Sequence, residues 1–340
     1  MPPDSALATL SDSLTNASTA LYTFAAVAFA AVFAYRRTTV AAPAAVQVRE
    51  RVLAGVGARE EPVADPVPVP APVAAAEPEP EAGVFTADRF GRFAVGLTVL
   101  GWAVQLAALV TRGLAADRVP WANMYEFICA ATFTAVTAML VLFSRKRTYY
   151  LGAFVMFPVV VALGLATTIL YIPVSPLQPS LHSYWLAIHV LAAVISCGGF
   201  TVTTALTALY LYRGRVASAD DDPADRSTVA AIASRLPGAA TLERLARQTL
   251  MFAFPIWTFA IIAGAIWADN AWGRYWGWDP KETWAFITWI VYAACLHAQT
   301  TRGWSGRKAA VIALLGYGCL LYNLIGVNIW GSGLHSYAGE

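Results

Sequence analysis

Long runs of apolar residues alternate with shorter polar segments along most of this chain. Each run is about as long as the roughly 20 residues that an α-helix needs to cross the hydrocarbon core of a bilayer. The pattern therefore predicts an all-α integral membrane protein with about eight transmembrane helices. The predicted spans are Ala17–Tyr35, Phe90–Val110, Tyr125–Phe143, Tyr150–Ile172, Tyr184–Tyr212, Leu250–Ala268, Thr283–Thr301 and Ala309–Trp330.

Basic residues gather at one end of these spans and orient them. Arg36 and Arg37 follow the first span, and Arg302 follows the seventh. Because positively charged loops stay in the cytoplasm, we expect both termini to lie outside. Arg112 and Arg118 lie in the first outer loop and count against this pattern.

Residues 38–88 have a different composition from the rest, being mostly Ala, Val, Pro and Glu. Such a segment cannot form a packed core, so we expect a disordered cytoplasmic linker that acts mainly as a spacer. It would separate an N-terminal anchor helix within residues 1–37 from a membrane domain over residues 89–340. The sequence leaves open whether the first span belongs to the folded core.

The composition narrows the class of protein further. Hydrophobic residues make up 58% of the 340 residues and charged residues 13%, against about 25% charged residues in ordinary soluble domains. A net charge of +2 gives no reason to expect nucleic acid as a partner. The four cysteines lie inside apolar runs without a CxxC or CxxCH pattern, so neither a zinc site nor a haem-bearing cytochrome is indicated.

Ionisable residues inside predicted spans each need an explanation. Glu126 begins the third span, and it is either a surface charge that reaches the interface or a functional partner. His189 lies roughly 7 Å below the outer end of the fifth span, and His335 lies just beyond the eighth. His297 lies near the cytoplasmic end of the seventh span and cannot reach that pair. His182 is expected to be a solvated loop residue.

The segment from Trp272 to Trp284 is dense in aromatic residues and also contains Asp279-Pro280-Lys281-Glu282. Pro280 interrupts a helix, so we expect a loop or a short surface helix between two spans. An interfacial aromatic belt alone would scatter its tryptophans instead of clustering them. Two neutral imidazoles, of His189 and His335, beside an aromatic shelf would suit a bis-histidine haem site. Histidines hydrogen-bonded to backbone carbonyls are the competing interpretation.

These segments together resemble the WWD-domain haem-handling family, of the CcsA (ResC) type found in system II cytochrome c biogenesis; naming varies, and members are also called CcsB. The resemblance covers about residues 90–340 and is specific, because the tryptophan signature occurs with three histidine segments. The matching segments are Trp272-Gly-x-x-Trp276-x-Trp278-Asp-Pro-Lys-Glu282, Tyr184-Trp-Leu-Ala-Ile-His-Val190, Tyr292-x-x-x-x-His297, Gly333-Leu-His-Ser-Tyr337 and Pro120-x-x-Asn-Met-Tyr-Glu126.

The resemblance implies that haem b, as substrate and ligand, passes from the cytoplasmic side to an outer site beneath the Trp-rich loop (about 269–284). His189 and His335 would be its axial ligands there. His297 would be an intramembrane ligand whose partner histidine comes from a ResB/CcsB-like membrane protein. The protein would lie in a bacterial plasma membrane, among lipid, with the loop on the extracytoplasmic side. Trp272, Trp276 and Trp278 would hold the macrocycle. Asp279 is a further candidate residue of the cofactor site, with capping or bracing of the loop as the alternative role.

The implied reaction is covalent attachment of haem to the CxxCH thiols of an apocytochrome c, kept reduced by a thioredoxin-like protein. The chain would be part of a holocytochrome c synthase that acts chiefly by placement, since no residue stands out as an acid or base. Arg274 or Lys281 would pair with the haem propionates. Two alternatives remain, namely a haem exporter or chaperone without synthase activity, and a structural assembly subunit.

Overall fold

The computed structural model describes residues 5–35, 82–145, 149, 151–175, 181–219, 233, 236–331 and 333–335. Within these ranges the chain is all-helical and contains no strand, which confirms the predicted fold class. The helices are α1 (Ser5–Tyr35), α2 (Ala82–Ala116), α3 (Met124–Arg145), α4 (Leu151–Thr168), α5 (Tyr184–Ala219), α7 (Ala239–Trp272), α8 (Pro280–Thr300), α9 (Arg307–Leu321), the π-helical turn η2 (Tyr322–Gly326) and α10 (Val327–Trp330).

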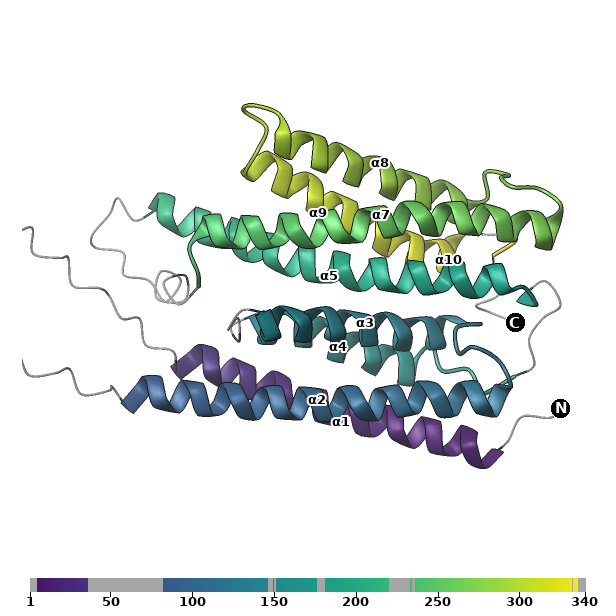
Figure 1. Ribbon diagram of the computed structural model, residues 1–340, viewed down its shortest axis with the longest axis horizontal. Helices are drawn as coiled ribbons and strands as arrows, with labels where there is room; N and C mark the ends of the chain where they lie inside the picture. Colours follow the sequence, from purple (N-terminus) through teal and green to yellow (C-terminus); the bar gives the residue numbers. More distant parts are fainter. Residues whose placement is uncertain are drawn as a thin grey trace, which may run out of the picture.

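Seven segments of the described chain are long and apolar enough to cross a membrane, so the protein is a multi-pass membrane protein. The last of them, Arg307–Trp330, combines α9, η2 and α10. The remaining predicted span, the seventh (Thr283–Thr301), corresponds to α8, which is not among these segments because its Trp, Thr, Gln and His positions make it less apolar. In Figure 1, α8 nevertheless runs alongside α7 and α9.

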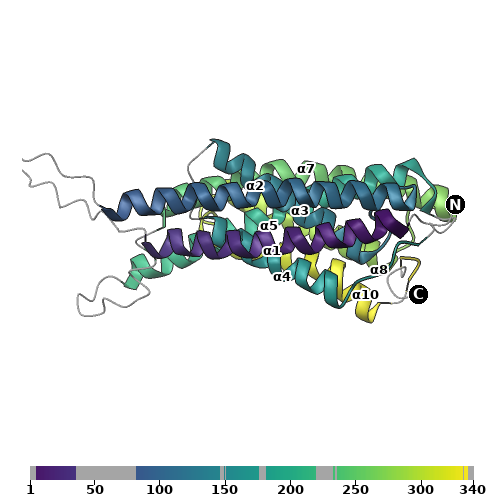
Figure 2. The same ribbon diagram turned by 90° about the horizontal axis from the view of Figure 1, so that it is seen from below.

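The helices form two groups that run along one long axis (Figures 1 and 2). Helices α1 to α4 make up the first half, and α5 with α7 to α10 makes up the second. One hydrophobic cluster is built mainly from α1 to α4 but also includes residues of α5 and α7, and a second lies among α5, α7, α8 and α9. Helix α3 packs against α5 between the two groups. The start of α1, the start of α5, the connection from α7 to α8 and the end of α10 lie at the same end of the bundle (Figure 1), which we call the loop end.

Helix α1 begins at Ser5, well before the predicted start at Ala17. Hydropathy missed these turns because their polar residues are satisfied inside the fold. Ser11 is buried and donates a hydrogen bond to the Ala108 carbonyl of α2 at 2.9 Å. Further along, Tyr22 is fully buried and lies in the same cluster as residues of α3 and α4.

The described residues contain almost none of the predicted linker over residues 38–88. Residues 38–81 lie outside them, and α2 already begins at Ala82. At the other side of the bundle, α5 continues to Ala219 and α7 begins at Ala239, so both helices extend beyond the predicted spans into the polar segment between them.

A buried ion network joins α1, α2 and α3 near the loop end. Glu126, whose side chain is fully buried, accepts from Arg112 Nε at 2.9 Å and from Arg118 Nη1 at 2.7 Å. Arg112 also reaches Asp12 of α1 at 3.3 Å. Glu126 is therefore not a surface charge that reaches the interface. The two arginines that count against the charge pattern are neutralised by carboxylates within the fold.

Candidate functional site

The Trp-rich segment forms a short loop between two helices with well-defined ends. Helix α7 is capped at its C-terminal end by Gly273, which has φ +70° and whose N–H donates to the Asp269 carbonyl at 2.8 Å. Helix α8 begins with Pro280 in its first turn, where the missing proline N–H costs nothing. Asp279 and Glu282 form a capping box at this start, because the side chain of each accepts a hydrogen bond from the backbone N–H of the other.

The charged side chains of Glu282 and Arg274 point into the loop and hold its backbone together. Glu282 accepts from the backbone N–H groups of Gly277 at 2.8 Å and Asp279 at 3.1 Å. Arg274 Nη1 lies 3.5 Å from the same carboxylate. A Cβ at Gly277 would overlap the Arg274 guanidinium, so a larger residue there would displace that side chain. Trp278, with φ +59°, occupies a left-handed conformation that is rare for a bulky residue.

His189 projects from the first turns of α5 towards α7. Its Nδ1–H donates to the Ala260 carbonyl at 2.7 Å, because a carbonyl oxygen can only accept. This bond fixes the tautomer and makes Nε2 the nitrogen with a lone pair. The ring comes so close to α7 that a Cβ at Gly264 would lie 2.7 Å from two of its atoms.

His335 is held in the same manner by a carboxylate. Its Nδ1–H donates to Asp279 Oδ1 at 2.9 Å, while Leu334 N–H donates to Oδ2 at 2.7 Å. Burial alone would raise the pKa of the Asp279 carboxyl, but the bonds from His335 and the backbone hold it below its usual value. A Cβ at Gly333 would lie 2.3 Å from Oδ2, so this close approach requires glycine.

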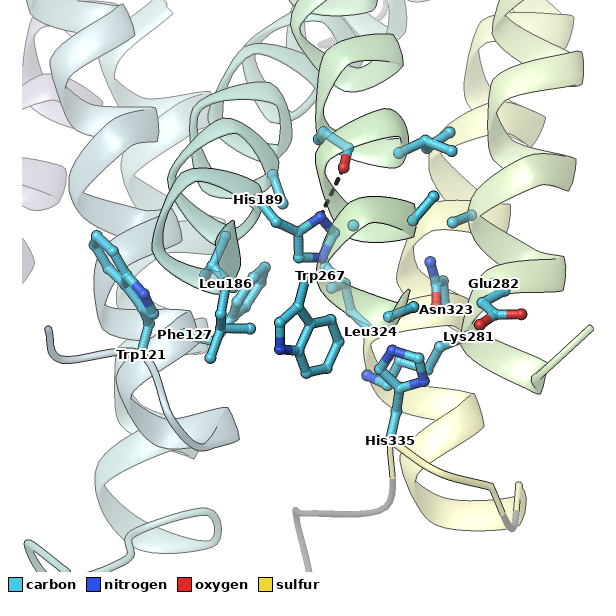
Figure 3. Close-up of a pocket in the computed structure, with 18 of the residues that line it drawn as sticks. Trp121, Phe127, Leu186, His189, Trp267, Lys281, Glu282, Asn323, Leu324 and His335 are labelled. Atoms are coloured by element: carbon cyan, nitrogen blue, oxygen red, sulfur yellow. Dashed lines mark hydrogen bonds between the residues drawn. The ribbon is translucent and has the colours of Figure 1, made fainter. Parts of the chain in front are cut away.

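Trp267 of α7 lies between the two histidines (Figure 3). Its ring is nearly parallel to that of His189, with centroids 6.2 Å apart, and meets His335 edge-on at 5.5 Å. Trp272 packs against both Trp267 and His335 at 4.8 Å. The two imidazoles therefore face a shared space that one indole ring occupies.

Around these residues lies a cavity of about 200 Å³. Its walls come from both halves of the molecule, and they are mostly apolar. Polar exceptions include Lys281, Asn323 and Asn328. Asn323 lies in the π-helical turn η2, a deviation from α-helix that often occurs at functional sites. Such an apolar cavity with a few polar groups is typical of a site for a small organic ligand.

The structure brings together some of the predicted site residues and separates others. Trp276 lines the cavity, whereas Trp278 lies outside it, 67% exposed and edge-on to Trp276. His297 is exposed on the outward face of α8 and takes no part in this cavity. His182 is exposed as well.

Trp267 and Asn323 are cavity residues to which the sequence interpretation gave no role. One signal for the first was available, because Ala260, Gly264 and Trp267 recur at helical spacing and so share one face of α7. No comparable signal exists for Asn323, since a π-helical turn is not visible in a hydropathy pattern. Among the described residues, no group of three or more His, Cys, Asp or Glu could hold a bare metal ion.

Comparisons with known proteins agree with this architecture. The family described as "Cytochrome C assembly protein" matches residues 121–335. The chain is 35% identical over 258 residues to the cytochrome c biogenesis protein CcsA of Guillardia theta, covering 71% of this chain and 84% of that protein. It is 36% identical over 283 residues to CcsA of Synechocystis sp., covering 68% and 83%.

Among solved structures, the cytochrome c heme lyase CcmF superposes with a TM-score of 0.56 at 20% identity. The match covers 94% of this chain and 46% of that one, so this chain spans slightly less than half of the length of CcmF. At this identity the likeness concerns the fold alone. Through the family match and its CcsA relatives, the chain belongs to the cytochrome c assembly protein family.

Proposed function

We propose that the loop-end cavity binds haem b as substrate, with His189 and His335 as axial ligands. The observation that carries this proposal is the pair of imidazoles, each with Nδ1 committed to an acceptor and Nε2 left as the ligating nitrogen. A histidine that binds metal usually has such a second hydrogen bond, which fixes its ring and raises its basicity. The competing interpretation, a bond to a backbone carbonyl, is compatible with ligation because that bond uses the other nitrogen.

The rest of the cavity fits a large planar ligand. Its walls are mostly apolar, and Trp276 and Trp257 contribute wide flat faces to them. Trp267 now lies between the imidazoles, so its indole has to rotate aside before a macrocycle can be held by both. Trp272 would then pack on the edge of the site beside His335.

His297 would serve a second position, shared with a ResB/CcsB-like membrane protein. It lies on a stripe of α8 with Phe286 and Ile290, all three exposed. An imidazole on an otherwise apolar surface of a membrane protein is costly unless it meets a partner. Haem would bind first at that position and then move to the loop end. We propose that the loop end lies on the extracytoplasmic side of a bacterial plasma membrane.

The proposed reaction is attachment of haem to the CxxCH segment of an apocytochrome c. Each cysteine S–H adds across a vinyl C=C, so that sulfur bonds to one carbon and hydrogen to the other, without net oxidation. Haem supplies the vinyl groups, and a thioredoxin-like protein would keep the thiols reduced. The chain's own residues bind and orient, which raises the effective concentration of the reacting groups. Its His189 and His335 hold the iron until the histidine of the CxxCH segment replaces one of them.

The test is an absorption spectrum with haem quantification of the chain purified together with its ResB-like partner. We expect a low-spin bis-histidine spectrum that is lost or strongly altered in a His189→Ala, His335→Ala double variant. His182→Ala is the matched control, since His182 is exposed and lies outside the cavity. A haem-free wild type, isolated intact with its partner from haem-replete cells, would contradict the proposal and favour a structural assembly subunit.

A second assay separates a synthase from an exporter or chaperone. The haem-loaded complex is incubated with reduced apocytochrome c, and covalent haem is detected on the denatured product. Thioether formation that depends on His335 supports synthase activity. A known synthase is run under the same conditions as a positive control. If it gives the covalent product while this complex binds haem without forming any, the function is haem transport without synthase activity.

A further inference from the structure

Lys281 differs from the other charged residues of the Trp-rich segment in where it lies. It stands in the first turn of α8, is partly buried, and lines the cavity together with His189 and His335. Figure 3 shows it beside His335. Among the described residues, no carboxylate oxygen pairs with its ammonium group. A lysine in such an apolar surrounding loses hydration and gains from an anionic ligand.

The neighbouring carboxylates are already committed elsewhere. Asp279 accepts from His335, from Leu334 N–H and from the backbone N–H of Lys281. Glu282 closes the loop by accepting from Gly277 and Asp279 and by facing Arg274. Each carboxylate thus has a structural role that leaves Lys281 without a dedicated counter-ion.

Arg274, the other cation near the site, is also occupied. Its guanidinium lies 3.5 Å from Glu282, fills the space over Gly277 and sits above the Trp272 ring at 5.9 Å. It does not line the cavity. The two sequence candidates for an anion contact are therefore no longer equivalent.

A second polar group marks the same wall. Asn323 is 5% exposed, lines the cavity, and its Oδ1 has no hydrogen-bond partner. A buried amide oxygen without a partner calls for a donor, which an ordered water or a protonated group can supply. The amide oxygen of Asn323 cannot itself bind a carboxylate, since both accept hydrogen bonds, but it can accept from a water that a carboxylate holds. The amide N–H groups of Asn323 can donate to a carboxylate directly.

We propose that Lys281, assisted by Asn323, forms the anion subsite of the cavity and selects a ligand that carries a free carboxylate. The inference rests on the proposed function and deepens it. The carboxylate would be one haem propionate, and Lys281 would be a specificity-determining residue. Arg274 would brace the loop without touching the ligand.

The test compares two porphyrins that differ only in this group, namely haem and haem dimethyl ester. Their affinities are measured by spectral titration of the complex with its ResB-like partner, after bound haem has been removed. For the wild type we expect haem to bind about tenfold more tightly than the diester, the range of a charge-assisted hydrogen bond. In Lys281→Met the two porphyrins should bind with about equal affinity. Lys281→Arg should retain most of the preference for haem.

Two controls keep the outcomes distinct. Arg274→Gln removes the competing cation, and Lys308→Gln removes a lysine beside Trp304 outside the cavity; both should keep the wild-type preference. The subsite assignment is overturned if the wild type binds the two porphyrins equally, or if Arg274→Gln abolishes the preference and Lys281→Met does not. If the intact wild type binds neither porphyrin, the proposed function itself fails.

Discussion

The two halves of the bundle treat buried charges in different ways. In the α1–α4 half, the charges of Arg112, Arg118 and Glu126 are paired with one another and with Asp12, although Arg118 Nε has no hydrogen-bond partner. In the α5–α10 half, the imidazoles and Lys281 face a cavity, and part of their bonding capacity stays unused. Charges that are already paired have little to gain from a ligand, whereas unused donors and acceptors are suited to one. Under the proposed function, the α1–α4 network would brace the fold and the α5–α10 half would supply the charged contacts to the ligand.

The largest expected effect comes from breaking the paired charges of the α1–α4 half. Glu126→Gln leaves two buried guanidinium groups without their shared carboxylate, which should lower the free energy of unfolding by about 3–5 kcal/mol. Thermal unfolding of the detergent-purified protein measures this loss. Asp117→Asn changes an exposed acid nearby and should have almost no effect. Equal stability of wild type and Glu126→Gln would remove the distinction between the halves.

A smaller change on the other half should affect ligand binding more than stability. Gly264→Ala places a Cβ 2.7 Å from the His189 ring, so the imidazole has to move away from its ligating position. We expect at least a tenfold loss of retained haem, measured by spectral titration. Gly318→Ala, also within a helix but with open space around it, is the matched control. Unchanged haem in Gly264→Ala would contradict the assigned role of His189.

The bond between Asp279 and His335 gives a pH-dependent effect of about 1 kcal/mol. Asparagine can still cap α8 but lacks the charge that faces His335, so Asp279→Asn should lose about this much stability at neutral pH. The folded pKa of Asp279 is lowered, so its contribution is fully present above the unfolded value of about 3.9. That contribution is lost as the pH falls through the folded pKa.

The measurement is thermal unfolding of both proteins from neutral pH down to about pH 3. The two curves should converge as the pH falls. A difference that widens on acidification would mean that Asp279 is not stabilised as a carboxylate in the folded protein.

The smallest expected effect is that of Trp278→Ala. Trp278 is 67% exposed and does not line the cavity, so its truncation should change stability by less than about 0.5 kcal/mol and leave haem affinity within a factor of two. Trp276→Ala, which removes part of the cavity wall, should weaken haem binding several-fold in the same titration. If Trp278→Ala weakens binding more, the macrocycle must lie outside the cavity described here.

The sequence predicted the features that depend on local pattern, and it missed those that depend on packing. Apolar run length predicted the helices, and Pro280 correctly indicated an interruption before α8. The polar start of α1 was missed because Ser11 bonds to a distant part of the chain. Likewise, hydropathy counts Arg112 as a charge in a loop, and only the fold shows that Glu126 neutralises it.

The same distinction applies to the candidate site. The spacing of His189 and His335 from the ends of their spans places both near the Trp-rich loop, and in the structure both line one cavity there. Their second hydrogen-bond partners, Ala260 and Asp279, are set by how α5, α7 and the C-terminal segment meet. The place of Trp267 between the rings depends on the same contacts and has no signature in a single sequence.

The cavity takes its walls from both halves, since Trp121 and Phe127 belong to the α3 side and His189 and Lys281 to the other. Any ligand that binds only this assembled form adds to the work needed to separate the halves. At a free concentration a hundred times its dissociation constant, that addition is about 2.7 kcal/mol. A bound ligand would thereby hold the two halves together. The ligand-free protein would be the form that membrane proteases degrade first.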